Sequence, residues 1–197
     1  MSKVGGRLRW IFRTEKINIV AFKALQMAII QDMLNNGKSP MEIQKYIESL
    51  GRYFGDLLYI DYHARGGKIA QSIADIGQIA NLFYISIFGE SLDKIYYSFN
   101  RETNSIYLHL IAYGGFPTCR GIVSPHPNIK LGAFLVGGIN RMLELKKGEL
   151  EYREAYSWEK NCVCTGEEKC EIIIKFVVDD KVFERLLSRI GGVHIER

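Results

Sequence analysis

The spacing of apolar residues changes near residue 90, where the first β-prone runs appear, and this change limits the folds that the chain can adopt. Before it, apolar side chains recur at helical spacing in three segments; after it, β-prone runs come in adjacent pairs. These two spacings are typical of amphipathic helices and of strands. Strands that follow one another closely in sequence pair antiparallel. We therefore expect an α+β domain, an antiparallel sheet of two hairpins covered by helices.

The first half predicts three helices. One covers 18–34 and stops at a turn-forming Asn-Asn-Gly. Ser39-Pro40-Met41-Glu42 has the pattern of a capping box, with proline at the first helical position, and starts a second helix that reaches about Tyr62. A third covers 67–88 and stops at Gly89.

The second half predicts a hairpin, a helix, a second hairpin and a closing helix. The segment 113–128 is rich in glycine and proline and is expected to be irregular. The predicted elements are strands at 94–99 and 105–111, a glycine-containing helix at 129–145, strands at 150–158 and 171–178, and a helix at 181–190.

Size and charge favour a single soluble domain. The chain has 197 residues, of which 47% are hydrophobic, and a net charge of +4, so we expect one domain over 1–197. Basic and aromatic residues mix in a possible N-terminal arm, 1–16. Short basic termini are more often solvated tails than contacts with nucleic acid or membrane, so we expect no nucleic-acid partner.

Neither a membrane span nor a secretory signal is expected. No run approaches the ~18 apolar residues that a spanning helix needs, and the N-terminus lacks an apolar stretch followed by a small-residue cleavage site. We therefore expect a cytoplasmic protein, in which thiols stay reduced. Reduced, clustered cysteines favour metal or redox roles over a structural disulfide.

The segment 159–170 carries most of the chemistry, with three of the four cysteines. A hairpin centred on Gly166 would pair residues whose numbers sum to 332, and so place Cys162 opposite Cys170 and Cys164 opposite Glu168. Facing side chains lie roughly 5 Å apart at Cβ. Such thiols can bind a metal, form a disulfide or simply pack. Because Glu159 stands three residues before Cys162, it can join them only through a bulge or turn.

This segment resembles a known family signature. Glu159, Cys162, Gly166 and Cys170, continuing into Glu171-Ile-Ile-Ile, are similar to the C-terminal motif of the 4-vinyl reductase domain family. That family includes archaeal stand-alone proteins and the sensor domains of phenol-responsive activators, and TRAPP tethering subunits are more distant relatives of similar fold. The C-terminal half carries the resemblance, and upstream only the element order agrees.

The resemblance implies a zinc site. In the phenol sensors the glutamate and both cysteines of the motif bind zinc, which carries over to Glu159, Cys162 and Cys170. The family's third cysteine lies just before the glycine-containing helix and has no counterpart here at 125–128. The fourth ligand is therefore open, with Cys119 favoured over His126 and Cys164. A closed site with four protein ligands is structural rather than catalytic.

The resemblance also implies a binding function. We expect a small hydrophobic or aromatic ligand between helices and sheet, with His109 as a candidate hydrogen-bond donor or else a core histidine. A reductase of tetrapyrrole vinyl groups is one alternative, although no residue points to hydride chemistry, and a ligand-free interaction module is another. An apolar cavity beneath the helices separates the first reading from the last. Family members associate through helices, so a homodimer through 18–34 and 67–88 is expected.

Overall fold

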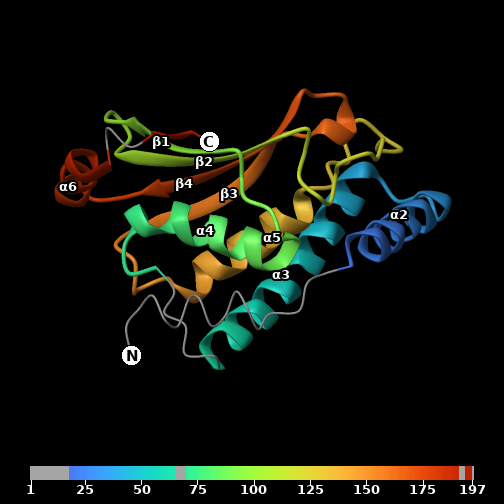
Figure 1. Ribbon diagram of the computed structural model, residues 1–197, viewed down its shortest axis with the longest axis horizontal. Coiled ribbons are helices and arrows are strands. Elements are labelled where there is room, and N and C mark those ends of the chain that lie inside the picture. Colours follow the sequence, from blue (N-terminus) through green and yellow to red (C-terminus); the bar gives the residue numbers. More distant parts are fainter. Residues whose placement is uncertain (1–17, 65–69, 191–193, 197) are drawn as a thin grey trace.

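The computed structural model describes residues 18–64, 70–190 and 194–196 (Figure 1). The proposed arm at 1–16 and the first residues of the helix expected at 67–88 lie outside these ranges. In chain order the elements are α2 (Ile19–Asn35), α3 (Pro40–Ala64), α4 (Ile73–Phe88), β1 (Lys94–Asn100), β2 (Ser105–Tyr113), α5 (Ala133–Leu145), β3 (Glu154–Asn161), the 3₁₀ turn η1 (Val163–Thr165), β4 (Lys169–Val177), α6 (Asp180–Ile190) and β5 (His194–Glu196).

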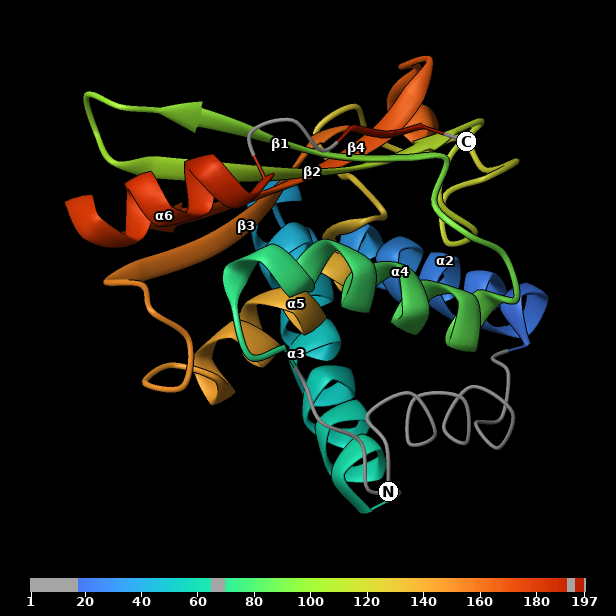
Figure 2. The same cartoon turned by 60° about the vertical axis from the view of Figure 1, so that its left-hand side comes forward.

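The strands form one antiparallel sheet in the order β3-β4-β2-β1-β5. Helices α3, α4 and α5 lie against one face of it, and none of the described helices covers the other (Figures 1 and 2). The predicted α+β class and its helix-covered hairpins are confirmed. Strand β5, which pairs with β1 at the sheet edge, was not predicted, because a three-residue strand carries too little periodicity to be recognised.

Alternation along the strands separates two faces. In β2, Ile106, Leu108 and Leu110 belong to the core beneath the helices, as do Ile172 and Ile174 in β4. Residues between them point to the uncovered face, because successive side chains of a strand alternate. Each central strand thus supplies both the core and the open surface.

Two predicted helix boundaries are confirmed by their hydrogen bonds. The Ser39 hydroxyl accepts from the backbone N–H of Glu42, and the Glu42 carboxylate accepts from the backbone N–H of Ser39 at 2.9 Å. This reciprocal pair is the predicted capping box. The second boundary is the C-terminal end of α4. This helix stops at Gly89, whose φ of +83° is left-handed, a conformation that glycine adopts without strain.

Two predicted boundaries were wrong. Helix α5 begins at Ala133 rather than 129, because Ile129 and Leu131 are apolar for burial in the preceding turn and not for a helical face. Strand β3 begins at Glu154 rather than 150. The alternation seen in the sequence continued through Leu150 and Tyr152, which pack into the core from the turn before the strand. Buried turn residues mimic the spacing of regular elements.

Helices α3 and α5 approach each other through glycine. A Cβ at Gly137 would lie 1.9 Å from the carbonyl oxygen of Glu48, and one at Gly51 would lie 1.9 Å from that of Phe134. Main-chain atoms cannot move aside as a flexible side chain can. These glycines therefore allow α5 to pack closely against α3.

Among the residues that the structure describes, no helix combines the length and apolar character that crossing a membrane requires.

We predict that Gly137→Ala lowers the free energy of unfolding by about 1–3 kcal/mol, because overpacking forces the two helices apart. Chemical denaturation measures it. Gly138→Ala is the matched control, because its Cβ would meet its nearest neighbour at 3.3 Å. Equal losses in both variants, or the gain of about 1 kcal/mol that alanine brings to an exposed helix, would contradict the close contact.

Candidate metal centre and ligand cavity

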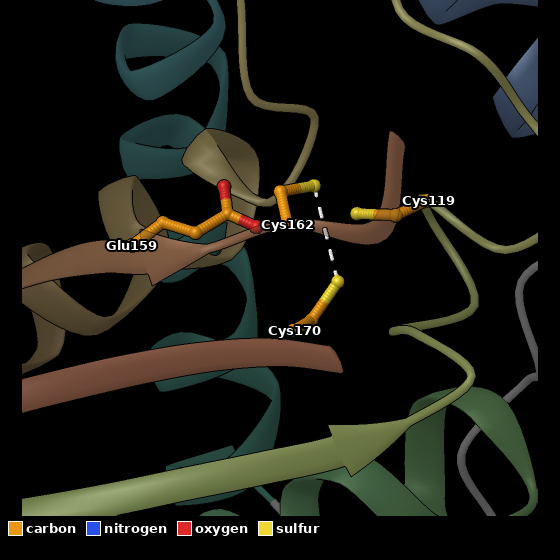
Figure 3. A group of neighbouring side chains, drawn as sticks. All are labelled: Cys119, Glu159, Cys162 and Cys170. Carbon is orange, nitrogen blue, oxygen red and sulfur yellow. Dashed lines mark hydrogen bonds between the residues drawn. The ribbon is translucent and has the colours of Figure 1, made fainter. Parts of the chain in front are cut away.

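Four potential metal ligands meet at the end of the sheet. The Sγ atoms of Cys119, Cys162 and Cys170 and a carboxylate oxygen of Glu159 all lie within 4.8 Å of one another (Figure 3). The three cysteines are fully buried and Glu159 is 8% exposed. All three cysteines are free thiols. The residues favoured from the sequence are therefore brought together; that they bind a metal stays a prediction.

A bulge in β3 brings Glu159 and Cys162 to the same side. Glu159 is opposite Ile172 while Asn161 is opposite Glu171, so the register shifts by one residue between them. Before the bulge, the numbers of paired residues in β3 and β4 sum to 331; after it, they sum to 332. The second register is the one expected to place Cys162 opposite Cys170. Their Sγ atoms are 3.8 Å apart. The bulge required for Glu159 to join the cysteines is present.

Cys119 arrives from the connection after β2. Its backbone N–H donates to the carbonyl of Phe116 at 2.8 Å, closing a tight turn. This turn follows Gly115, whose φ of +98° requires glycine. The irregular segment expected at 113–128 is thus folded back over the sheet end, which places a thiol there.

The other two candidates for the fourth ligand do not belong to this mutually close set. The predicted pairing of Cys164 with Glu168 was wrong, because Cys164 belongs to η1 and not to a strand. Its Sγ lies 2.9 Å from that of Cys162, yet it falls outside the mutually close set. His126 uses Nδ1 to accept from the backbone N–H of Asn128, and it too is outside the set.

The donor set suits a tetrahedral thiolate metal such as zinc. Zinc–sulfur bonds of ~2.3 Å place two thiolates about 3.8 Å apart across a tetrahedron, which is the separation of Cys162 and Cys170. Both carboxylate oxygens of Glu159 are buried without a hydrogen-bond partner. A buried carboxylate is normally hydrogen-bonded or paired with a charge. A cation bound among the thiols would neutralise these oxygens.

Gly132 makes room for this carboxylate. A Cβ at Gly132 would lie 2.3 Å from Oε1 of Glu159. The φ of Gly132 is −71°, which any residue adopts, so the side-chain contact and not the backbone requires glycine here. Nothing in the sequence pattern marked this position, because it depends on a residue of another element.

Crowding sets the protonation of the cluster. The pKa of the Cys162 thiol is lowered far below its usual value, because the thiols of Cys119, Cys164 and Cys170 donate to it. For Cys170, a hydrogen bond with Cys119 lowers the pKa, but the bond to Cys162 and burial outweigh it and raise the pKa to about 12. Burial raises the pKa of Glu159, and neighbouring Cys162 raises it further. Without a cation, the cluster holds few negative charges.

An apolar cavity of about 150 Å³ lies between the helices and the sheet. Its walls come from α3, α4, α5, the central strands and the segment before β1. Among the described residues that line it, Lys146 is the one that carries a charge, and its ammonium is paired with Glu149 at 2.5 Å. The apolar residues around it include Phe54, Ile76, Ala80, Phe83, Leu110, Phe116, Leu135, Met142 and Ile172.

His109 does not line this cavity. It lies on the uncovered face, with its ring stacked on Tyr96 at a centroid distance of 4.2 Å. Its Nε2 is 2.9 Å from the hydroxyl of Ser98, and its Nδ1 is 2.9 Å from the carboxylate of Glu171. Burial alone would raise the pKa of Glu171, but His109, Lys160 and Lys169 outweigh burial and lower it. This network could not be predicted from the sequence, because its members come from three separate strands.

Comparison with known proteins supports the fold and not a family. No protein-family model matches the chain, and no curated protein matches it. A TRAPP complex subunit 3 from Naegleria fowleri, covalently bound to palmitic acid, is 15% identical with a TM-score of 0.60 over 81% of this chain and 99% of that one. The phenol-bound sensory domain of the activator PoxR is 14% identical with a TM-score of 0.52, over 88% and 82%.

A vinyl-4-reductase family protein from Methanocaldococcus jannaschii is 17% identical over 85% of this chain and 86% of that one, with a TM-score of 0.43. That score is too low to support a conclusion. The predicted likeness of fold to TRAPP subunits and phenol sensors is confirmed, whereas membership of the 4-vinyl reductase domain family stays a prediction.

We predict that, in chelator-treated protein, Glu159→Gln raises the free energy of unfolding at pH 8 by about 1–3 kcal/mol. A carboxyl whose pKa is raised by folding destabilises the folded state once the pH exceeds its unfolded pKa of about 4.3. Glutamine removes that cost, so the gain should be present at pH 8 and fade towards pH 4. Urea unfolding at both pH values measures it.

Added zinc should reverse this ranking if Glu159 is a ligand, because wild type then gains a bond that glutamine cannot make. A variant that is less stable than wild type at pH 8 in the presence of chelator would show that Glu159 is not an uncompensated buried charge.

Proposed function

We propose that this protein binds a small apolar or aromatic molecule in the cavity beneath its helices. The cavity itself is the observation that carries the proposal, because its walls are almost wholly apolar. Ligand sites in proteins are concave, mostly apolar and usually formed in advance. An interaction module without a ligand has no need of such a space, and cavities reduce the stability of a core.

The volume of the cavity limits the size of its ligand. A space near 150 Å³ is comparable to an engineered apolar cavity that stays dry and binds benzene. We therefore propose a molecule with a single aromatic ring or of similar bulk. The phenol-bound relative binds a ligand of this size, whereas palmitic acid, bound by the other, is too large for the cavity in its present form.

We predict that Ala80→Leu weakens binding of toluene at least tenfold, because the larger side chain occupies space that the ligand needs. Binding is measured as the rise in melting temperature with toluene concentration, since a ligand that binds only the folded state stabilises it. Ala24→Leu, which adds the same atoms at an exposed position of α2, is the control. Toluene that stabilises both variants equally, or that leaves wild type unchanged, would count against the cavity as the binding site.

We further propose that Cys119, Glu159, Cys162 and Cys170 hold one zinc ion. Three thiolates and a carboxylate fill a tetrahedral site, which leaves no position for a reactive water. The ion would join β3, β4 and the connection after β2, and so stabilise the end of the sheet. Such thiols stay reduced in the cytoplasm, where we propose the protein resides.

We predict one zinc per chain in wild type and less than a tenth of that in Cys170→Ser, measured by elemental analysis of purified protein. Cys164→Ser is the matched control and should keep its zinc, because Cys164 lies outside the set of mutually close ligands. A zinc-free wild type would refute the site. Loss in both variants would make Cys164 a ligand.

We propose that the homodimer forms through exposed apolar side chains of α2 and α3. The side chains of Val20 and Leu25 on α2 and of Tyr53, Leu57 and Ile60 on α3 are each more than 60% exposed. The residues expected from the sequence on α4 are not among the exposed large apolar side chains. We therefore propose association through α2 and α3 rather than α4, and native mass spectrometry of the same zinc-analysis sample reports the stoichiometry.

A further inference from the structure

Three polar side chains form a continuous hydrogen-bonded line across the uncovered face of the sheet. Ser98 on β1, His109 on β2 and Glu171 on β4 are joined by two contacts of 2.9 Å, one at each nitrogen of the imidazole. This line uses none of the proposed zinc ligands and none of the residues that line the cavity.

The strand registers fix this line. His109 is directly opposite Tyr96 on one side and Ile173 on the other. Ser98 and Glu171 each stand two residues from these partners, so they are diagonal neighbours of His109 on the same face. Regular strands therefore hold all three, and no mobile loop is needed to assemble them.

The surroundings set the direction of the hydrogen bonds. Glu171 contacts His109 through Oε1, while its Oε2 lies 3.5 Å from the ammonium of Lys160 and 3.7 Å from that of Lys169. A carboxylate only accepts, so Nδ1 of His109 carries the proton. In that tautomer the lone pair of Nε2 faces the Ser98 hydroxyl, which can donate to it. This is the tautomer in which a histidine can remove the proton of a serine.

Burial keeps the histidine in place. Glu171 is 1% exposed and His109 is 9% exposed, whereas Ser98 is only half-buried. The ring of Tyr96 lies parallel to the imidazole, with an interplanar angle of 5°. The base and its carboxylate are thus fixed and largely shielded from water, and the hydroxyl is within reach of a molecule on the surface.

We propose that Ser98 is an activated nucleophile, with His109 as its general base and Glu171 as the residue that positions the histidine. The reaction class is acyl transfer from esters with an apolar or aromatic group. Two aromatic residues flank the serine on this face: Tyr107 is directly opposite it, and Tyr96 stands two residues before it on the same strand. On the far side of Tyr107, Lys175 of β4 lies over the rings of Tyr107 and Tyr156 at 5.9 and 5.8 Å.

The step balances without a further reagent. Oγ of Ser98 bonds to the ester carbonyl carbon while its proton passes to Nε2 of His109. The bond from that carbon to the leaving oxygen then breaks, and the leaving alcohol takes the proton from Nε2. Water releases the acyl group from Ser98 by the same sequence, which restores the hydroxyl and yields a carboxylic acid.

A fluorophosphonate tests the nucleophile directly. Oγ of Ser98 would bond to phosphorus as fluoride leaves, and peptide mass mapping of wild type identifies the modified residue. We expect one adduct per chain, on Ser98, and a rate at least about 100-fold lower in His109→Gln, the usual minimum contribution of a general base. Hydrolysis of 4-nitrophenyl acetate should fall with it, and Ser98→Ala should show neither reaction.

Ser188 provides the matched control, because it is exposed and its hydroxyl donates to a helix carbonyl rather than to a histidine. Labelling of Ser98 in wild type at a rate no higher than that of Ser188 would overturn the proposal, even if the histidine variant fails to fold. Equal labelling of wild type and folded His109→Gln would also overturn it.

Glu171→Gln tests the positioning role by a readout other than rate. Nitrogen NMR of the imidazole should show the proton on Nδ1 in wild type and a shift towards Nε2 in the variant. An unchanged tautomer would remove Glu171 from the proposal.

Discussion

The bulge in β3 is the constraint on which the end of this domain depends. Before it, odd-numbered residues such as Ser157 and Glu159 face the helices. After it, the even-numbered Cys162 faces the same interior, beside Cys170 of the neighbouring strand. One extra residue in β3 thus lets an odd-numbered and an even-numbered side chain, Glu159 and Cys162, point to the same side of the sheet. Bulges commonly redirect side chains in this way.

The buried cluster of Cys119, Glu159, Cys162 and Cys170 needs its charge to be neutralised. Three thiols and a carboxyl share a space that water hardly reaches, and the unpaired oxygens of Glu159 show that the protein does not satisfy them by itself. Neutralisation by protons and neutralisation by a cation are the two ways to accommodate such groups. The raised pKa of Glu159 reflects the first of these, and the donor geometry favours the second.

Much of the fold could be predicted from the sequence, because helices and strands of this size carry clear periodicity. The capping box at Ser39 and the stop at Gly89 could be assigned from local chemistry alone. Errors occurred where apolar residues are buried in turns, as at Leu131 and Leu150, and at β5, which owes its existence to an available edge. Periodicity records burial, and burial is not confined to regular elements.

The candidate sites could be predicted only in part. A local motif and a family resemblance pointed to Glu159, Cys162 and Cys170, and Cys119 was chosen among three candidates that no local pattern distinguished. The role of Gly132 could not be predicted, because it depends on contact with the side chain of Glu159, which is distant in the sequence. The line through His109 combines residues of three strands whose registers are set by the whole sheet.

Cys170 and Glu171 are consecutive in β4 yet belong to opposite sides of the sheet, one among the thiols and the other against His109. A slip of β4 by a single residue would disrupt both sites, because each step along a strand reverses the side to which a residue points. A slip in one direction would bring the Glu171 carboxylate into the thiol cluster, and a slip in the other would bring the Cys170 thiol against the imidazole. Cys170 and Glu171 therefore help to specify the register of β4, since only one register gives each of them a compatible partner.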